Sequence, residues 1–161
     1  MRDALIIGIA CVAAIFLGAW LYFSGTGTDT PKAQSGFTVL EKGMQSGSLT
    51  SRANYRIKSK EELDALWNLV YGSGGPAAAV DFTKEEVLAV FDGSHSSGGY
   101  DITVDSVKDE GGVRKIHITH TIPGEGCAVS SAITSPYQIV IVPRSSLPLS
   151  RTDATATADC R

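Results

Sequence analysis

The sequence predicts an α+β domain, with a mainly antiparallel β-sheet of five to seven strands and one packed amphipathic helix. Residues 87–91 are apolar at every position, which is typical of a strand covered on both faces. In residues 100–104, apolar and polar side chains alternate, which indicates a strand with one buried face. Residues 60–71 instead repeat apolar side chains at helical spacing. These three patterns together predict a sheet with a helix on one side.

A single N-terminal transmembrane helix is predicted before this domain. Residues 4–23 carry no charge, and at about 1.5 Å per residue they span roughly 30 Å, the thickness of the bilayer core. Arg2 lies on the first side, so residues 1–3 are expected in the cytoplasm. Residues 24–36 are rich in Gly, Ser and Thr, which favours a flexible tether. We therefore expect a single-pass protein of the cell membrane with an extracytoplasmic domain; a cleaved signal peptide is the alternative.

The first half of the domain contains the predicted helix. Residues 37–40 and 49–58 are expected to form strands. Ser59 and Glu62 then form a capping box, which starts a helix over residues 60–71. Gly72 is placed for a left-handed C-cap. The apolar stripe expected to face the sheet consists of Leu63, Leu66, Trp67 and Val70. Thr83 and Glu86 repeat the capping pattern, so a single helical turn is predicted there.

The second half of the domain is expected to be β-structure. The strands at 87–91 and 100–107 should lie in one sheet, with the loop between them at its rim. Residues 113–121 should pair with 100–107 in antiparallel fashion through the three-residue loop 110–112. Val104 then lies opposite Ile118, and Asp105 opposite His117. After a long loop, residues 137–142 should form a central strand, and 147–149 an edge segment.

The C-terminal tail, residues 150–161, is expected to be mobile unless a disulfide holds it. Cys127 and Cys160 both lie in the predicted extracytoplasmic part, where disulfides persist, so they are candidates for such a bond. The alternative is a pair of free thiols. Cys11 lies inside the predicted membrane helix, where it acts as a small apolar side chain.

Four stretches in this order resemble the family of PrcB-type protease complex subunits. They are IKSKEELDALW at 57–67, VLAVFDG at 87–93, SSGGYDITV at 96–104 and TSPYQIVIVP at 134–143. The resemblance covers residues 37–149, taken as one PrcB-like extracytoplasmic domain. It implies an accessory subunit that binds and supports a partner protein such as a secreted protease. It does not imply a protease.

Composition and motifs argue against several other functions. The net charge of -3 and the lack of a basic cluster exclude a nucleic-acid surface. The chain contains no G-x-S-x-G motif and no phosphate-binding or dinucleotide glycine pattern, and a serine next to a histidine does not make a catalytic pair. His117 and His120 point to opposite faces of a strand, which disfavours a metal site. We therefore expect neither an enzyme nor a cofactor or metal.

Binding through loops is the remaining prediction. The candidate partner-binding loop consists of Asp92, Gly93, Ser94, His95, Ser96, Ser97, Gly98, Gly99 and Tyr100. It would share a surface with loop 123–136 if both lie at one end of the sheet, where Asp92, His95 and Glu125 could meet. A purely structural role for the paired glycines and Tyr100 is the competing interpretation. The alternative function is a non-catalytic module that binds a ligand or peptide with these loops; the oligomeric state stays open.

Overall fold

The structure is a computed structural model that describes residues 36–73 and 78–159. These residues belong to a compact unit that spans residues 33–161. The predicted cytoplasmic segment, the membrane helix at 4–23 and all of the tether except Gly36 lie outside the described residues. In the described part of the chain, no helix is long and apolar enough to cross a membrane.

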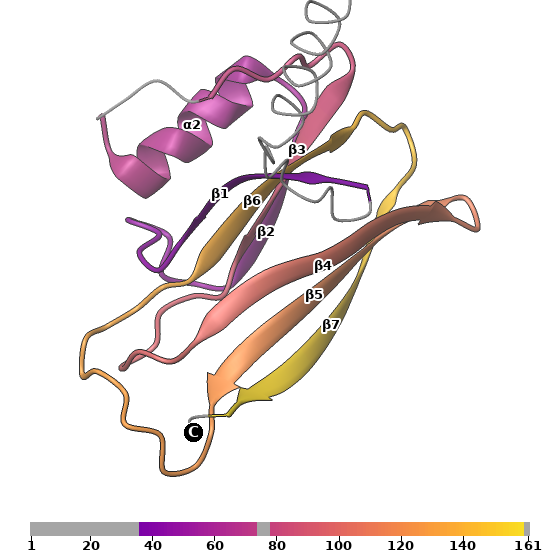
Figure 1. Cartoon of the computed structure of the whole chain (residues 1–161). Coiled ribbons are helices and arrows are strands. Elements are labelled where there is room, and N and C mark those ends of the chain that lie inside the picture. Colours follow the sequence, from indigo (N-terminus) through magenta and orange to yellow (C-terminus); the bar gives the residue numbers. More distant parts are fainter. Residues whose placement is uncertain (1–35, 74–77, 160–161) are drawn as a thin grey trace, which may run out of the picture. The chain divides into compact units, whose positions relative to one another are not determined.

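In the described residues, seven strands form two sheets, and one helix packs beside them (Figure 1). The first sheet has the antiparallel order β1 (Thr38–Gly43), β6 (Tyr137–Pro143), β3 (Glu85–Phe91), β2 (Ala53–Ile57). The second has the order β4 (Asp101–Glu110), β5 (Val113–Pro123), β7 (Leu149–Ala158). In it, β4 and β5 are antiparallel, whereas β5 and β7 are parallel. The helix is α2 (Lys60–Tyr71).

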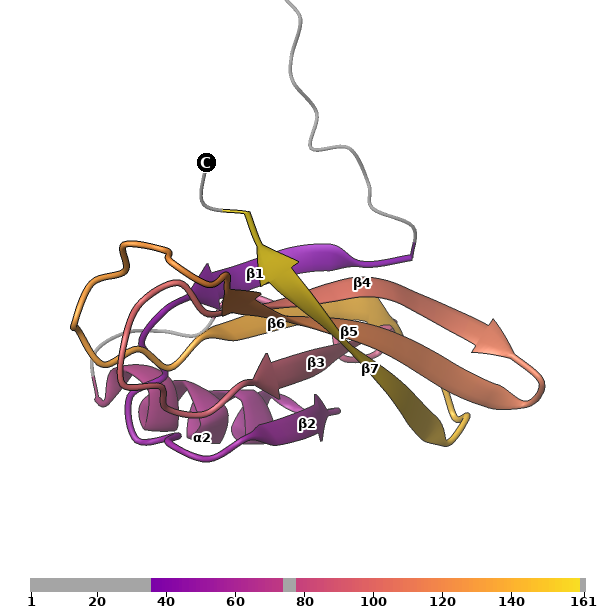
Figure 2. The same ribbon diagram turned by 90° about the horizontal axis from the view of Figure 1, so that it is seen from below.

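The first sheet lies between α2 and the second sheet, which gives three layers (Figure 2). Alternate residues of β3 therefore face different layers: Leu88 and Val90 pack toward the second sheet, and Val87 and Phe91 pack toward α2. Residues 87–91 are all at most 1% exposed, which confirms the predicted strand covered on both faces. β6 is central, as predicted, because it lies between β1 and β3.

The prediction of a single sheet is wrong. β3 belongs to the first sheet and β4 to the second, so the loop between them crosses from one layer to the other. Alternation along a strand tells which face is buried, but it does not tell which sheet the strand joins. The two sheets are also tied directly, since the Val104 amide donates to the Gln138 side-chain oxygen at 2.6 Å.

The helix matches its predicted bounds. Ser59 Oγ accepts from the Glu62 amide at 3.3 Å. The Glu62 carboxylate accepts from the Lys58 amide at 2.7 Å, one residue earlier than the capping box predicted. Gly72 has a positive φ of 69°, but its ψ of -159° lies outside the left-handed helical region. Of the predicted stripe, Trp67 is only partly buried and packs against the core; the fully buried members are Leu63, Leu66 and Val70.

The β4–β5 hairpin contains a bulge that the sequence did not predict. Val104 pairs with Ile118, as expected, but the register then shifts, and Ser106 lies opposite His117. The predicted Asp105–His117 pair is therefore wrong. A bulge places two residues against one on the partner strand, and here Asp105 is the extra residue. It accepts a 2.6 Å hydrogen bond from Thr119, and the turn shortens to two glycines, 111 and 112.

The C-terminal segment is a strand, which corrects the prediction of a tail at 150–161. β7 pairs with β5 in parallel along its whole length, from Leu149 opposite Arg114 to Ala158 opposite Pro123. No sequence pattern indicates this strand because it has no buried face: residues 149–157 are all exposed. Of the edge segment predicted at 147–149, only Leu149 lies in a strand, as the first residue of β7.

A buried ionic network lies at the end of the domain where β3 begins. Glu86 is fully buried, so the predicted capping role for it is wrong. Its carboxylate accepts from Arg56 at 2.9 and 3.1 Å and from Arg114 at 2.8 Å. Arg114 also forms two hydrogen bonds with Asp109, at 2.7 and 2.8 Å. Glu86 thereby connects both sheets, and the turn before β3 is organised by Asp81 instead.

Candidate partner-binding end of the domain

Two loops meet at the opposite end of the domain. Loop 92–100 connects β3 to β4, and loop 124–136 connects β5 to β6 (Figure 1). The His95 amide donates to the Thr134 carbonyl at 2.8 Å, and the Thr134 amide donates to the His95 carbonyl at 3.0 Å. The Gly98 amide donates to the Ser130 carbonyl at 2.9 Å. The two loops therefore form one structure, which meets the condition left open in the sequence, that both lie at one end; we call it the loop end.

The carboxylate of Asp92 is the centre of the loop end. Asp92 follows directly after the last residue of β3, and its side chain is 2% exposed. One oxygen accepts from Arg52 Nη2 at 2.8 Å and from His120 Nδ1 at 2.7 Å. The other oxygen bonds His95 Nε2 at 2.8 Å. One carboxylate at the end of β3 thus joins the residue before β2, loop 92–100 and β5.

This environment keeps Asp92 ionised. Burial raises the pKa of Asp92, but the hydrogen bonds from His95 and His120 and the charges of His120 and Arg52 together outweigh burial. Its pKa therefore lies below the ordinary value of 3.8. Because an ionised carboxylate can only accept hydrogen bonds, His95 Nε2 and His120 Nδ1 must each carry a proton.

Loop 92–100 is closely packed at the His95 ring and at its two adjacent glycines. His95 stacks on Tyr100 with ring centroids 3.8 Å apart and planes 7° apart. A Cβ on Gly99 would lie 2.8 Å from the Val129 side chain, and Gly99 has a φ of +87° that favours glycine. A Cβ on Gly98 would lie 2.7 Å from the Ser130 hydroxyl oxygen. The glycines thus allow the two loops to approach closely, which is the structural role weighed in the sequence analysis.

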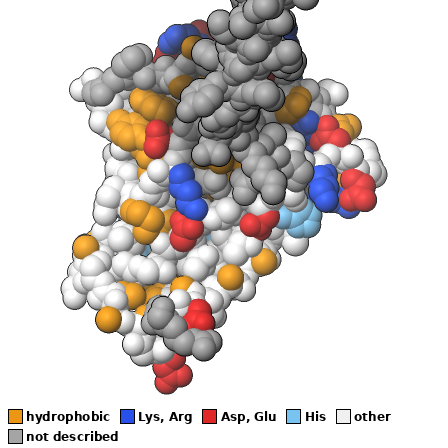
Figure 3. Space-filling view, viewed as in Figure 1, with side chains coloured by type: hydrophobic (Ala, Val, Ile, Leu, Met, Phe, Trp, Pro, Cys, Tyr) orange, Lys and Arg blue, Asp and Glu red, His pale blue; other side chains and the backbone are white. Residues whose placement is uncertain are grey.

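The loop end presents apolar side chains to the solvent. Ile133 is 68% exposed, more than any other large hydrophobic side chain in the described residues. Val129 in the same loop is 37% exposed, and Met44, whose carbonyl accepts from the Ser135 amide, is 39% exposed. The backbone under Ile133 is fixed, since its carbonyl accepts from Gln45 Nε2 at 2.8 Å. Figure 3 shows hydrophobic side chains spread over the lower end of this face, where no lysine or arginine is visible. Sequence reasoning missed Ile133 because no pattern marks an exposed residue in an irregular loop.

The remaining predicted site residues are placed as follows. Ser94 and Ser96 are exposed on the outer side of loop 92–100. In residues 36–73 and 78–159, no serine hydroxyl bonds a histidine, so the nucleophile–base pair of a serine hydrolase is not formed there. Glu125 is exposed and is not a partner of Asp92. The described residues hold no group of three or more side chains suited to a metal.

Cys127 lies in loop 124–136 and is disulfide-bonded. Cys160 lies outside the described residues, so the pairing of these two cysteines stays a prediction. The described neighbours are compatible with it. Ala158 pairs with Pro123, and a Cβ on Gly124 would lie 2.6 Å from the Ala158 carbonyl and 3.4 Å from Cys127 Sγ.

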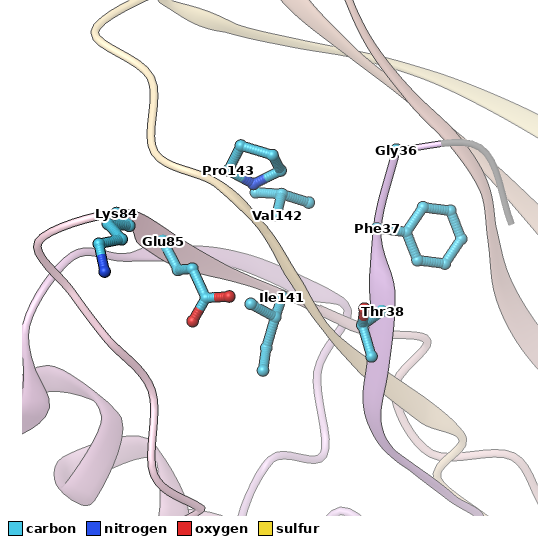
Figure 4. Close-up of a pocket in the computed structure, with 8 residues that line it drawn as sticks. All are labelled: Gly36, Phe37, Thr38, Lys84, Glu85, Ile141, Val142 and Pro143. Carbon is cyan, nitrogen blue, oxygen red and sulfur yellow. The ribbon is translucent and has the colours of Figure 1, made fainter. Parts of the chain in front are cut away.

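One pocket lies away from the loop end. It has a volume of about 450 Å³ and is lined by residues 36–38, Lys84, Glu85 and residues 141–143. Figure 4 shows Phe37 and Thr38 on one side of it, with Lys84 and Glu85 on the other. Its only charged side chains are therefore one cation and one anion at its rim. Three further pockets of the described structure are also lined by residues outside both loops.

Comparison with known families identifies the central part of this domain. Residues 87–143 match the family model described as PrcB C-terminal. No curated protein and no solved structure matches the chain. The matched segment runs from β3 to β6 and contains both loops of the loop end. The match confirms, for residues 87–143, the resemblance to PrcB-type proteins found in the sequence.

Proposed function

We propose that this chain is a membrane-anchored, extracytoplasmic accessory subunit that binds a partner protein through the loop end. The PrcB-type match supports a role as the accessory subunit of a protease complex. The observation that carries the binding surface is Ile133, a large apolar side chain 68% exposed on a hydrogen-bonded loop. Exposed apolar side chains on a fixed backbone are typical anchors of protein interfaces.

The loop end is suited to binding because little of it must be ordered on contact. Loop 92–100 is held at its start by the Asp92 carboxylate and in its middle by the Thr134 and Ser130 backbones. Loop 124–136 is held by the same bonds, and Thr134 Oγ1 donates to the Ser97 carbonyl at 2.7 Å. Preorganised loops lose less conformational entropy on association, which raises affinity for a given contact area.

In this proposal the chain supports a protease without performing catalysis itself. The two imidazoles of the loop end each bond Asp92, and the exposed hydroxyls of Ser94 and Ser96 are not directed to either. The chain would act by contact with the protease or with its substrate. Anchoring by residues 4–23 would hold this contact at the outer face of the cell membrane.

The ligand-binding alternative has less support. A small-molecule site is usually a concave apolar cavity with a few convergent polar groups. The four pockets described above are lined by residues outside both loops, and the largest apolar exposure at the loop end is the Ile133 side chain. A projecting side chain fits a hollow on a partner protein better than it fits a small ligand.

Co-purification tests the proposal. The tagged full-length chain is crosslinked mildly in native membranes and isolated, and accompanying proteins are identified by mass spectrometry. Ile133→Asp should reduce recovery of a protease by at least about ten-fold, since a central apolar anchor is worth roughly 1.4 kcal/mol or more. Leu69→Asp is the matched control, because Leu69 is 43% exposed on α2. Equal recovery of the protease with both variants, or none with the wild type, would contradict the proposal.

A further inference from the structure

The free edges of the two sheets differ in how they are protected. β1 carries a register shift between Val39 and Glu41 and a lysine, Lys42. β4 carries the bulge at Asp105 and ends in charged residues. Bulges and lysines are the usual devices that keep sheet edges from pairing with other chains. β2, the other edge strand of the first sheet, has only five residues.

β7 has neither a bulge nor a lysine, and its only charged side chains are Arg151 and Asp153. It is the outer strand of the second sheet, and its register with β5 is unbroken over ten residues. Its sequence, LSRTDATATA, contains no lysine and no proline. Residues 149–157 are exposed on both faces, so the strand adds little to the core. A long, regular edge without a bulge or a proline is a template for another strand.

The backbone direction of β7 follows from one hydrogen bond. Leu149 pairs with Arg114, and the Arg114 amide donates to the Pro148 carbonyl at 2.9 Å. In a parallel ladder, alternate residues direct both backbone groups to the same neighbour. The even-numbered residues of β7 therefore bond β5, and Leu149, Arg151 and Asp153 direct their amides and carbonyls to the free edge. An added strand would pair with these odd-numbered residues.

The charges on this edge are self-complementary. Arg151 and Asp153 lie two positions apart on one face, with Arg151 Nε 3.3 Å from Asp153 Oδ2. If two β7 strands pair in antiparallel fashion about a two-fold axis at Thr152, each Arg151 lies opposite the Asp153 of the other copy. Both are odd-numbered, so their backbone groups can bond across the axis. A shift of the axis to Asp153 would instead oppose two carboxylates, which is unfavourable.

We propose that β7 pairs with the β7 of a second copy of this chain, in the register that places Thr152 on the two-fold axis. The contact is isologous, since the same residues are used on both sides. It joins two three-stranded sheets into one continuous sheet of six strands. It uses a surface distinct from the loop end, so both copies keep that surface for a partner protein.

A mixing experiment with the full-length chain in detergent tests this proposal. In Arg151→Asp, both positions are acidic, and in Asp153→Arg both are basic. Each variant alone should associate about ten-fold more weakly than the wild type, because two attractive cross-strand pairs become repulsive. A mixture of the two variants should restore association, since every opposed pair is again of opposite sign. Two different affinity tags report mixed dimers, and circular dichroism verifies that each variant is folded.

Cysteine crosslinking gives a second readout. At a two-fold axis, Thr152→Cys brings two thiols within disulfide reach, so oxidation should yield a covalent dimer. Thr157→Cys is the matched control: it is equally exposed on β7, but its two copies would lie about 33 Å apart in this register. The wild-type chain, oxidised in the same way, shows how much covalent dimer the native cysteines form.

Two results would overturn the proposal. One is a mixture that forms no more mixed dimers than the individual variants form with themselves. The other is equal crosslinking at residues 152 and 157. If the chain is monomeric and Arg151→Asp instead reduces recovery of another protein, the edge binds a strand of that protein and not a second copy.

Discussion

Removing the buried charge of Glu86 should destabilise the domain strongly. Glu86→Gln keeps the shape of the side chain, so the cost comes from electrostatics and hydrogen bonding. Glu86 is fully buried and accepts three hydrogen bonds from two arginines. Breaking a buried ion pair costs about 3–5 kcal/mol, because the remaining charge loses its partner.

The structure indicates that Glu86→Gln lowers the free energy of unfolding by an amount near the lower end of that range. The Arg56 side chain is 15% exposed, and its guanidinium keeps the carbonyls of Leu147 and Ser145 as acceptors, each at 2.6 Å. Arg114 keeps both bonds to Asp109. We therefore expect a loss of about 3 kcal/mol, or roughly 10 °C in Tm for a domain of this size.

Asp109→Asn provides the matched control. Asp109 pairs with the same arginine, but its side chain is 42% exposed. Exposed pairs contribute about 0–1 kcal/mol, so this variant should lose at most 3–4 °C. Urea and thermal unfolding, followed by circular dichroism, measure both variants. If Glu86→Gln unfolds within about 1 kcal/mol of Asp109→Asn, the network does not hold the two sheets together as described.

Three further predictions concern the loop end. Asp92 has a folded-state pKa below 3.8, so the ionised carboxylate stabilises the fold above about pH 4. This stabilisation is lost as the pH falls through the lowered pKa. Asp92→Asn should therefore be less stable than the wild type at pH 7, and its free energy of unfolding should change less between pH 7 and acid pH. Gly99→Ala should cost more than Gly111→Ala in urea unfolding, since both have positive φ but only Gly99 would clash, with Val129. Non-reducing peptide mapping should find Cys127 joined to Cys160, and reduction should lower stability by roughly 3–4 kcal/mol; a Cys127 peptide joined to Cys11 instead would reject this pairing.

Local patterns predicted local structure well. The helix bounds were correct because the capping residue, the apolar spacing and the terminal glycine all lie within one segment. The strand at 87–91 was recognisable because burial on both faces leaves only apolar residues. The sequence allowed Asp92, His95 and Glu125 to meet at one end but did not require it. In the structure Asp92 contacts His95 and not Glu125, and His120 joins them from the buried face of β5.

Features that depend on distant partners were not predictable. Thr83 and Glu86 have capping spacing, yet Glu86 is buried because two arginines from other strands neutralise it. The bulge at Asp105 has no signal in the sequence, because a single inserted residue keeps the local pattern of apolar side chains. β7 lacks a buried face, and hydrophobic periodicity is the signal by which strands are found.

Site-specific photocrosslinking would test the central claim most directly. A photoreactive amino acid is placed at Ile133 in the full-length chain, and irradiation is carried out in native membranes. The same residue at Leu69, which is also exposed but lies on α2, is the control. Our account predicts a crosslinked protease from position 133 and little from position 69. A protease crosslinked from position 69 only, or from neither position, would contradict the assignment of the loop end as the surface that binds it.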